Sequence, residues 1–149
     1  MFTNVVQGMH DAAGVEAATA ADTLKALSDN KGVLIDTRSS DAQKVSMVKG
    51  ALTAEQFSAK VASGEIKPAG VTVYAHCWLG GASCNFAARN KSKLKEQGFE
   101  DVKSVRCGTI GLVVAGGTLL DSSGAETKTV HQYPDLKGTF PSGYTEKFS

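Results

Sequence analysis

Short segments rich in β-branched residues alternate with amphipathic segments along most of the chain. Three of the former, Val33–Ile35, Val71–Ala75 and Val102–Val105, have the length and composition of buried strands. Segments with apolar residues at helical spacing separate them, and the longest of these ends at Gly98. Strands that alternate with helices predict an α/β domain with a mostly parallel central sheet flanked by helices, in three layers.

Two of the predicted helices have recognisable N-terminal signals. Thr19 or Asp22 is placed to cap a helix that runs to about residue 28. Thr53 is followed three residues later by Gln56, which is the spacing of a capping box. The second helix is therefore expected to begin directly after Thr53.

The pattern changes after residue 120. The region 121–149 is polar and contains several glycines and prolines, yet it carries four of the chain's ten aromatic residues: Tyr133, Phe140, Tyr144 and Phe148. A solvated tail rarely has so many aromatic side chains. We therefore predict one domain at residues 15–120 and an irregular C-terminal extension at 121–149, which packs on the body or on a partner subunit of a homodimer.

Composition and charge exclude several classes of protein. The chain has 149 residues, 16 basic and 15 acidic, so its formal charge is +1, which argues against a nucleic-acid partner. No apolar run approaches the roughly 18 residues that cross a bilayer, so no membrane association is expected. The N-terminus lacks the pattern of a signal peptide, and the expected location is cytoplasmic, or periplasmic if the chain is a processed form.

The segment after the second predicted strand carries the chemistry. Cys77 follows that strand and begins a short loop that contains Gly80 and Gly81, and Ser83 leads the next helix. Ligands of parallel α/β sheets bind at this carboxyl edge. The glycines allow the backbone N–H groups to converge, and the helix N-terminus adds its dipole, so the loop is a candidate cradle for a thiolate or persulfide. The alternative is that Cys77 is a small buried apolar residue at a strand end.

Four segments in the same order resemble the single-domain rhodanese sulfurtransferases. They are Leu34–Arg38 with its Asp-x-Arg, Val48–Ala51, the strand-cysteine-loop segment Val73–Ser83, and Val105–Gly108 with the Ala-Gly pair that follows at 115–116. Each is weak alone, but all four match in order over about residues 15–120. The resemblance implies a rhodanese-like fold.

The resemblance also implies a mechanism and a site. The Cys77 thiolate would take a sulfur atom from thiosulfate or a polysulfide, become a persulfide, and pass the sulfur to cyanide or another thiol, with no cofactor. Its partners would be a small sulfur-containing substrate or a thiol or persulfide protein. The expected substrate-binding residues, mostly through backbone N–H groups, are Trp78, Leu79, Gly80, Gly81, Ala82, Ser83 and Arg38.

The loop departs from the family pattern in ways that bear on the donor. Many family members have a basic residue inside the loop, but this chain has Trp78 and Leu79 there. An apolar rim favours polysulfide or a protein persulfide over thiosulfate. The closing segment has Cys107 where the family usually has glycine, and it lacks the usual tryptophan nearby.

Several neighbouring residues have two interpretations each. Arg38 either supports the loop and steers an anion or forms a structural ion pair with Asp36, and we favour the latter. His76 is expected to point away from the Cys77 sulfur, since neighbours in a strand face opposite sides. Cys84 either resolves an oxidised Cys77 or is a buried helix residue. No Cys or His pair has the spacing of a zinc site, so no metal is expected.

Two other functions are considered for this sequence. A cysteine phosphatase needs His-Cys-x5-Arg, and here the arginine position is Ser83, so the bidentate phosphate clamp is missing. A rhodanese-like module that binds sulfur or senses redox state without turnover stays open, because the loop is atypical. That module predicts an unreactive Cys77 or a persulfide that is never released.

Overall fold

Five parallel strands form the central sheet. A computed structural model of the chain describes residues 15–78, 81–134 and 137–148. The strand order across the sheet is β1 (Ala17–Ala18), β6 (Asp101–Val105), β5 (Thr72–His76), β2 (Gly32–Asp36) and β4 (Ala51–Thr53). Every neighbouring pair in this sheet is parallel. The predicted α/β fold with a mostly parallel sheet is therefore confirmed.

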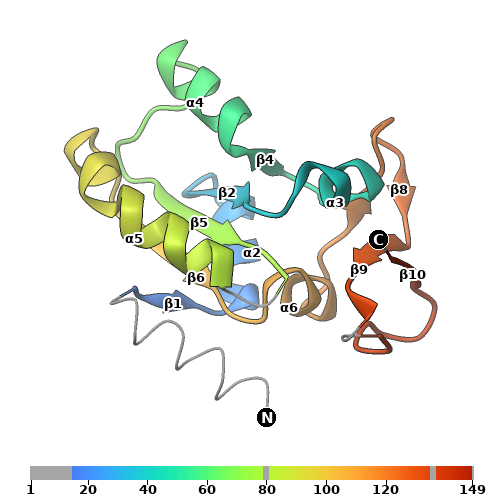
Figure 1. Cartoon of the computed structure of the whole chain (residues 1–149). Coiled ribbons are helices and arrows are strands. Elements are labelled where there is room, and N and C mark those ends of the chain that lie inside the picture. Colours follow the sequence, from blue (N-terminus) through green and yellow to red (C-terminus); the bar gives the residue numbers. More distant parts are fainter. Residues whose placement is uncertain (1–14, 79–80, 135–136, 149) are drawn as a thin grey trace.

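Helices cover both faces of the sheet, as Figure 1 shows. On one face lie α4 (Ala54–Ala62) and α5 (Gly81–Glu96), and on the other lie α2 (Ala20–Ser28) and α6 (Gly108–Val114). Successive residues of β2 face opposite sides of the sheet. Ile35 packs in the core under α4 and α5, and Leu34 packs in the core under α2 and α6. This alternation makes the domain three layers thick.

The predicted helix caps are present in the structure. The Thr19 side chain accepts a hydrogen bond from the Asp22 backbone N–H at 3.1 Å, so Thr19 is the cap of α2. Thr53 and Gln56 form both hydrogen bonds of the capping box, at 3.0 and 3.1 Å. These bonds satisfy N–H groups that the first helical turn leaves without a helical partner.

The helix after the cysteine loop begins earlier than the sequence predicts. We expected Ser83 to lead it, but α5 starts at Gly81 and has 16 residues. Ala82 and Ser83 therefore lie in its first turn, where backbone N–H groups have no partner within the helix. The last turn carries Lys93 and Lys95, whose positive charges suit a helix C-terminus.

The segments outside the central sheet form two smaller sheets. The strands β3 (Met47–Val48), β7 (Leu119–Leu120) and β8 (Glu126–Thr127) are antiparallel neighbours, and β9 (Thr129–Gln132) pairs in parallel with β10 (Thr145–Phe148). Another helix of the described residues, α3 (Ser40–Val45), contacts β9. Figure 1 shows these strands at the right, beyond α3, with β8 above the pair of β9 and β10.

The C-terminal extension contributes to the main core. Val130 is fully buried and Phe140 is 8% exposed, and both belong to the same apolar cluster as Leu34 of the central sheet. The boundary between 15–120 and 121–149 stays a prediction. Within the described ranges, no helix combines the length and apolar composition that a membrane crossing needs.

Candidate functional site

The backbone of Cys77 is fixed at the carboxyl end of β5, between β2 and β6. Its carbonyl oxygen accepts hydrogen bonds from the Thr109 backbone N–H at 2.7 Å and from the Thr109 hydroxyl at 3.1 Å. The Nδ1 atom of His76 lies 3.3 Å from the same oxygen. These contacts tie the start of the cysteine loop to the first turn of α6.

Gly108 makes this close approach possible. A Cβ atom at residue 108 would lie 2.0 Å from the carbonyl oxygen of Cys77 and 2.3 Å from that of Trp78, distances that no side chain tolerates. Gly108 also has a φ of +48°, and Cys107 before it has a φ of +58°. Residue 108 therefore has to be glycine for the loop to sit where it does. The predicted resemblance of this segment to a family glycine motif has a physical basis here.

The Cys77 side chain lies in a buried polar cluster. It is 4% exposed, and its Sγ atom is 3.6 Å from the Ser83 hydroxyl. That hydroxyl is 2.8 Å from the hydroxyl of Ser104 on β6, and the Cys84 thiol donates to Ser104 at 3.7 Å. All three cysteines of the chain are thiols in the structure. The sequence predicted roles for Cys77 and Ser83 but missed Ser104, which lies on a different strand.

The first turn of α5 lies beside the Cys77 sulfur. Ala82 and Ser83 belong to this turn, and Ser83 contacts the Cys77 Sγ atom. A helix N-terminus favours negative charge through its unpaired N–H groups and its dipole. Leu79 and Gly80, two of the predicted substrate-binding residues, lie outside the described residues. The site therefore rests here on Trp78 at one end of the loop and on the helix start at the other.

Trp78 is held by the C-terminal extension. Its Nε1–H donates to the carbonyl oxygen of His131 at 3.2 Å. The ring centroid of Trp78 is 4.2 Å from that of Tyr133 and 5.2 Å from that of His131. On another side, the Arg38 guanidinium lies 6.0 Å from the indole centroid. His131 and Tyr133 were not among the predicted site residues, and no local sequence pattern connects residues more than fifty positions apart.

Arg38 is engaged with Asp36 at the end of β2. The guanidinium contacts both carboxylate oxygens at 2.8 to 3.1 Å and donates to the Ser46 carbonyl oxygen at 2.6 Å. Both side chains are fully buried. Burial alone would raise the pKa of Asp36, but the nearby His76 ring and the Arg38 guanidinium outweigh it, so this pKa lies below its usual value. The carboxylate therefore stays charged and holds Arg38 in place beside Trp78.

His76 is part of the scaffold around the loop. The ring is fully buried, with Nε2 3.9 Å from Asp36 and Nδ1 3.3 Å from the Thr109 hydroxyl. Burial lowers the pKa of His76, although the Asp36 charge opposes this. The contacts described above connect His76 to the carbonyl of Cys77, which is consistent with its facing away from the sulfur.

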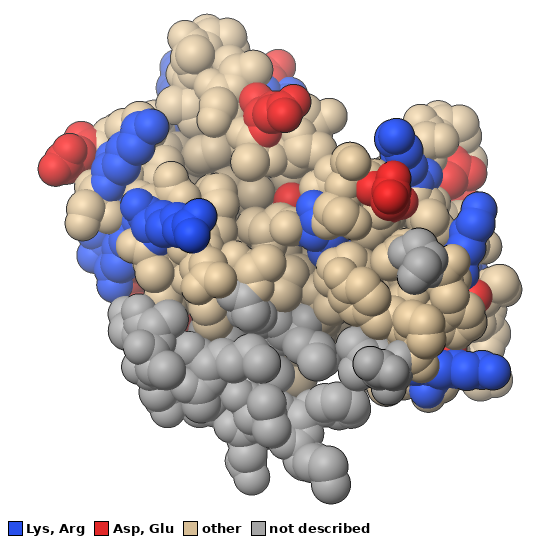
Figure 2. Space-filling view, in the orientation of Figure 1, with Lys and Arg blue, Asp and Glu red and all other residues tan. Residues whose placement is uncertain are grey.

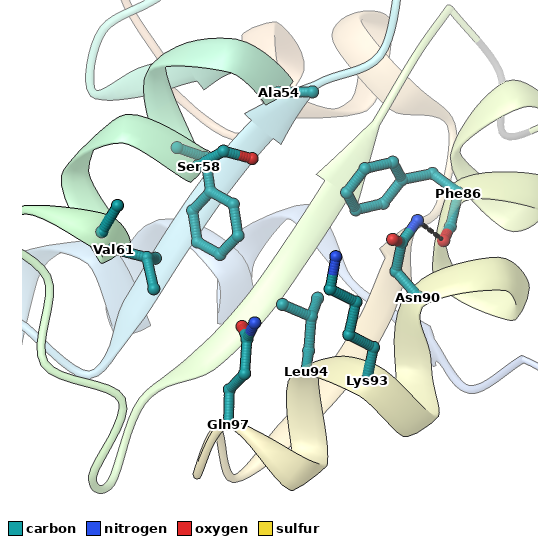
Figure 3. Close-up of a pocket in the computed structure, with 10 residues that line it drawn as sticks. Ala54, Ser58, Val61, Phe86, Asn90, Lys93, Leu94 and Gln97 are labelled. Carbon is teal, nitrogen blue, oxygen red and sulfur yellow. Dashed lines mark hydrogen bonds between the residues drawn. The ribbon is translucent and has the colours of Figure 1, made fainter.

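Two cavities adjoin one another beside α5. One, about 370 Å³, lies between α4 and α5, and Figure 3 shows Phe86, Leu94 and Lys93 around it. The other, about 440 Å³, lies at the carboxyl ends of β2 and β4 and includes Asp36 and Arg38. Ala54 and Phe86 line both cavities.

Basic side chains are frequent on α5, and one of them, Lys93, lines the cavity between α4 and α5. The helix α5 carries four basic residues and one acidic one: Arg89, Lys91, Lys93, Lys95 and Glu96. Figure 2 shows Lys and Arg side chains gathered at the left of the molecule, in the region where Figure 1 places α5. Among the residues that the structure describes, no group of three or more His, Cys, Asp or Glu side chains is arranged to hold a metal ion.

This geometry defines a class of protein: an α/β domain with a cysteine at the carboxyl end of the central strand, directly before a helix. Residues 19–111 match the rhodanese-like domain, and the chain belongs to that family. No curated protein gives a significant match.

Solved structures share the fold. The thiosulfate sulfurtransferase of Pseudomonas aeruginosa is similar with a TM-score of 0.58 and 17% identity, over 83% of this chain but 23% of that one. The BH2092 protein of Bacillus halodurans has a TM-score of 0.51 and 18% identity, over 74% and 80% of the two chains. A Rhodopseudomonas palustris protein, described as a possible tyrosine phosphatase of unknown function, has a TM-score of 0.50 and 20% identity, over 75% and 91%. At these identities the likeness establishes the fold only.

Proposed function

We propose that the protein is a sulfurtransferase that moves sulfane sulfur through a persulfide on Cys77. The observation that carries this proposal is the position of the Cys77 thiol, at the end of the central strand and in contact with Ser83 in the first turn of α5. The helix start stabilises negative charge on the inner or outer sulfur. The thiolate attacks the outer sulfur of the donor, and an acceptor then removes that sulfur.

Polysulfide or a protein persulfide is the favoured donor. The described part of the loop has Trp78, and the Arg38 guanidinium near its ring is buried and bonded to Asp36. The Arg38 charge is therefore already paired and is not available to a doubly charged thiosulfate ion at the loop. The apolar indole of Trp78, held by His131 and Tyr133, suits a less strongly hydrated donor.

Intact mass after brief incubation with sodium thiosulfate or with sodium polysulfide tests this proposal. Wild type is expected to gain about 32 Da, the mass of one sulfur atom, faster with polysulfide, and to lose it when cyanide is added. Cys77→Ser is expected to gain nothing, whereas the matched control Cys107→Ser loads normally. Absence of loading with both donors would rule the proposal out.

A second candidate is a rhodanese-like module that binds sulfur or senses redox state without turnover. The specific observation in its favour is that Cys77 is only 4% exposed, which limits access by large acceptors. It predicts a persulfide that forms but survives excess cyanide. A phosphatase is disfavoured, because the position that needs arginine is Ser83, and hydrolysis of p-nitrophenyl phosphate is expected to stay at background.

A further inference from the structure

The proposed mechanism leaves one buried nucleophile without a role. Cys84 lies in the first half of α5, is 3% exposed, and does not take part in the sulfur transfer described above. Burial raises the pKa of its thiol, and the nearby Cys77 adds to this, although the Ser104 hydroxyl acts in the opposite direction. Cys84 is therefore held as a protonated thiol in the resting protein.

Two serine hydroxyls connect Cys84 to Cys77. Starting from Cys84, the thiol donates to Ser104 at 3.7 Å, the Ser104 and Ser83 hydroxyls are 2.8 Å apart, and Ser83 is 3.6 Å from the Cys77 Sγ atom. All four side chains are almost fully buried. A continuous row of exchangeable protons thus joins the two thiols in a space that bulk water does not reach.

The scaffold around this row is rigid on one side and adjustable on the other. Ser104 is on β6, in register with Ala75 of β5, so strand pairing fixes its position relative to the Cys77 backbone. Ser83 and Cys84 are in the first turn of α5, where hydrogen bonds within the helix are fewest. A shift of this turn would move the Ser83 hydroxyl out from between the sulfurs and bring Cys84 toward Cys77, while Ser104 stays on its strand.

We propose that Cys84 is a resolving thiol, which attacks the inner sulfur of a Cys77 persulfide and releases hydrosulfide. This rests on the proposed function, because it needs the persulfide. A Cys84–Cys77 sulfur bond forms, and the bond between Cys77 and the outer sulfur breaks. Before the turn shifts, the Cys84 proton moves through Ser104 and Ser83 to the persulfide, and the outer sulfur then leaves as HS⁻ with the electron pair of the broken bond. The persulfide anion and one thiol thus give a disulfide and HS⁻, with sulfane sulfur reduced and two cysteines oxidised.

This step gives the protein a second fate for its sulfur. A thiophilic acceptor that reaches Cys77 first receives sulfur, whereas in its absence the protein releases sulfide and becomes a disulfide. Return to the starting state then requires a small-molecule thiol as reductant. In the disulfide the Cys77 sulfur is bonded to Cys84 and cannot attack a donor. The resolved form therefore also blocks further loading.

The experiment compares wild type with Cys84→Ser, which retains a hydroxyl able to donate to Ser104. Each protein is loaded with sodium polysulfide, freed of donor by gel filtration, and followed by intact mass and by a sulfide assay. In wild type the species about 32 Da heavier is expected to give way to one about 2 Da lighter than the reduced protein, with one sulfide released per disulfide. In Cys84→Ser the persulfide is expected to last at least about tenfold longer.

Controls separate this proposal from the one on which it rests. If Cys84→Ser and wild type both fail to gain sulfur, the proposed function is wrong. If both gain it and lose it at the same rate, the resolving role is wrong while the proposed function stands. Peptide mapping must place the disulfide between Cys77 and Cys84, and a bond to Cys107 would overturn the assignment. Cys107→Ser is the matched control and is expected to resolve like wild type, and Cys84→Ala repeats the test without a hydroxyl.

Discussion

Replacing Arg38 with methionine tests the buried ion pair beside the cysteine loop. The guanidinium meets both Asp36 oxygens at 2.8 to 3.1 Å, and neither side chain is exposed. Removing one partner leaves an uncompensated carboxylate in the interior, which costs about 3–5 kcal/mol of unfolding free energy. The Ser46 carbonyl also loses a donor. We therefore expect Arg38→Met to lose about 4 kcal/mol at pH 7.

The same pair predicts how the loss depends on pH. In wild type the pKa of Asp36 is below its usual value. The pair therefore contributes its full stability at pH values above the usual pKa and loses it as the pH falls through the pKa of the folded protein. In Arg38→Met the buried Asp36 carboxylate keeps only the His76 ring, 3.9 Å away, beside it, and uptake of a proton by either group as pH falls relieves the buried charge. The difference in unfolding free energy between the two proteins is therefore expected to shrink between pH 7 and about pH 4.

Urea unfolding followed by the fluorescence of the single tryptophan measures both effects. The double variant Asp36→Asn/Arg38→Met removes both charges and is expected to recover part of the loss. A loss below about 1 kcal/mol for Arg38→Met would refute the reasoning, because ion pairs that contribute so little are those exposed to solvent. A stable Arg38→Met that loads sulfur poorly would instead assign Arg38 the anion-steering role.

Three further predictions concern the loop and its supports. Ser83→Ala is expected to slow sulfur loading by about tenfold or more, because a hydrogen bond to a charged group contributes about 1.5–3 kcal/mol. The control Ser92→Ala, on the exposed side of the same helix, is expected to leave the loading rate unchanged. Gly108→Ala is expected to lose about 3 kcal/mol or more in urea unfolding, whereas Gly116→Ala, with positive φ but open space, loses only about 1–2 kcal/mol. Tyr133→Ala is expected to shift the tryptophan emission to the red and increase its quenching by acrylamide, because an aromatic contact worth about 0.5–1.5 kcal/mol is lost. An unchanged spectrum would contradict the role of Tyr133 in shielding Trp78.

Features encoded within a few residues could be read from the sequence. The capping box of Thr53 and Gln56 needs only one helical turn, and both of its hydrogen bonds are present. The strand around Leu34 and Ile35 has a composition that fits burial on both faces, and both residues are fully buried. The α/β fold followed because such local signals alternated regularly along the chain.

The start of α5 could not be fixed in the same way. Gly81 and Ala82 carry no capping side chain, whereas Ser83 does, so the sequence favoured a start at Ser83. In the structure the Ser83 hydroxyl bonds to Ser104 and contacts Cys77 instead of marking the helix start. A side chain with a tertiary partner gave a misleading local signal.

The surroundings of the cysteine depended on contacts between distant residues. Ser104 reaches the sulfur cluster through the register of β5 and β6, and that register is visible only once the strands are paired. The contacts of His131 and Tyr133 with Trp78 join the loop to the C-terminal extension. The sequence of that extension predicted that it packs on the body or on a partner subunit, but not which residues it contacts. The number of aromatic residues in that segment was the one signal that pointed to packing.

A single-turnover transfer measured at the level of one cysteine tests the central claim most directly. The protein is loaded with polysulfide, freed of donor and mixed with cyanide at once, and thiocyanate is counted per chain while peptide mapping follows the sulfur. The account predicts about one thiocyanate per loaded chain, and an extra sulfur that is found on Cys77 before cyanide and is gone afterwards. Thiocyanate that forms equally from Cys77→Ser, or a Cys77 persulfide that cyanide leaves intact, would contradict it.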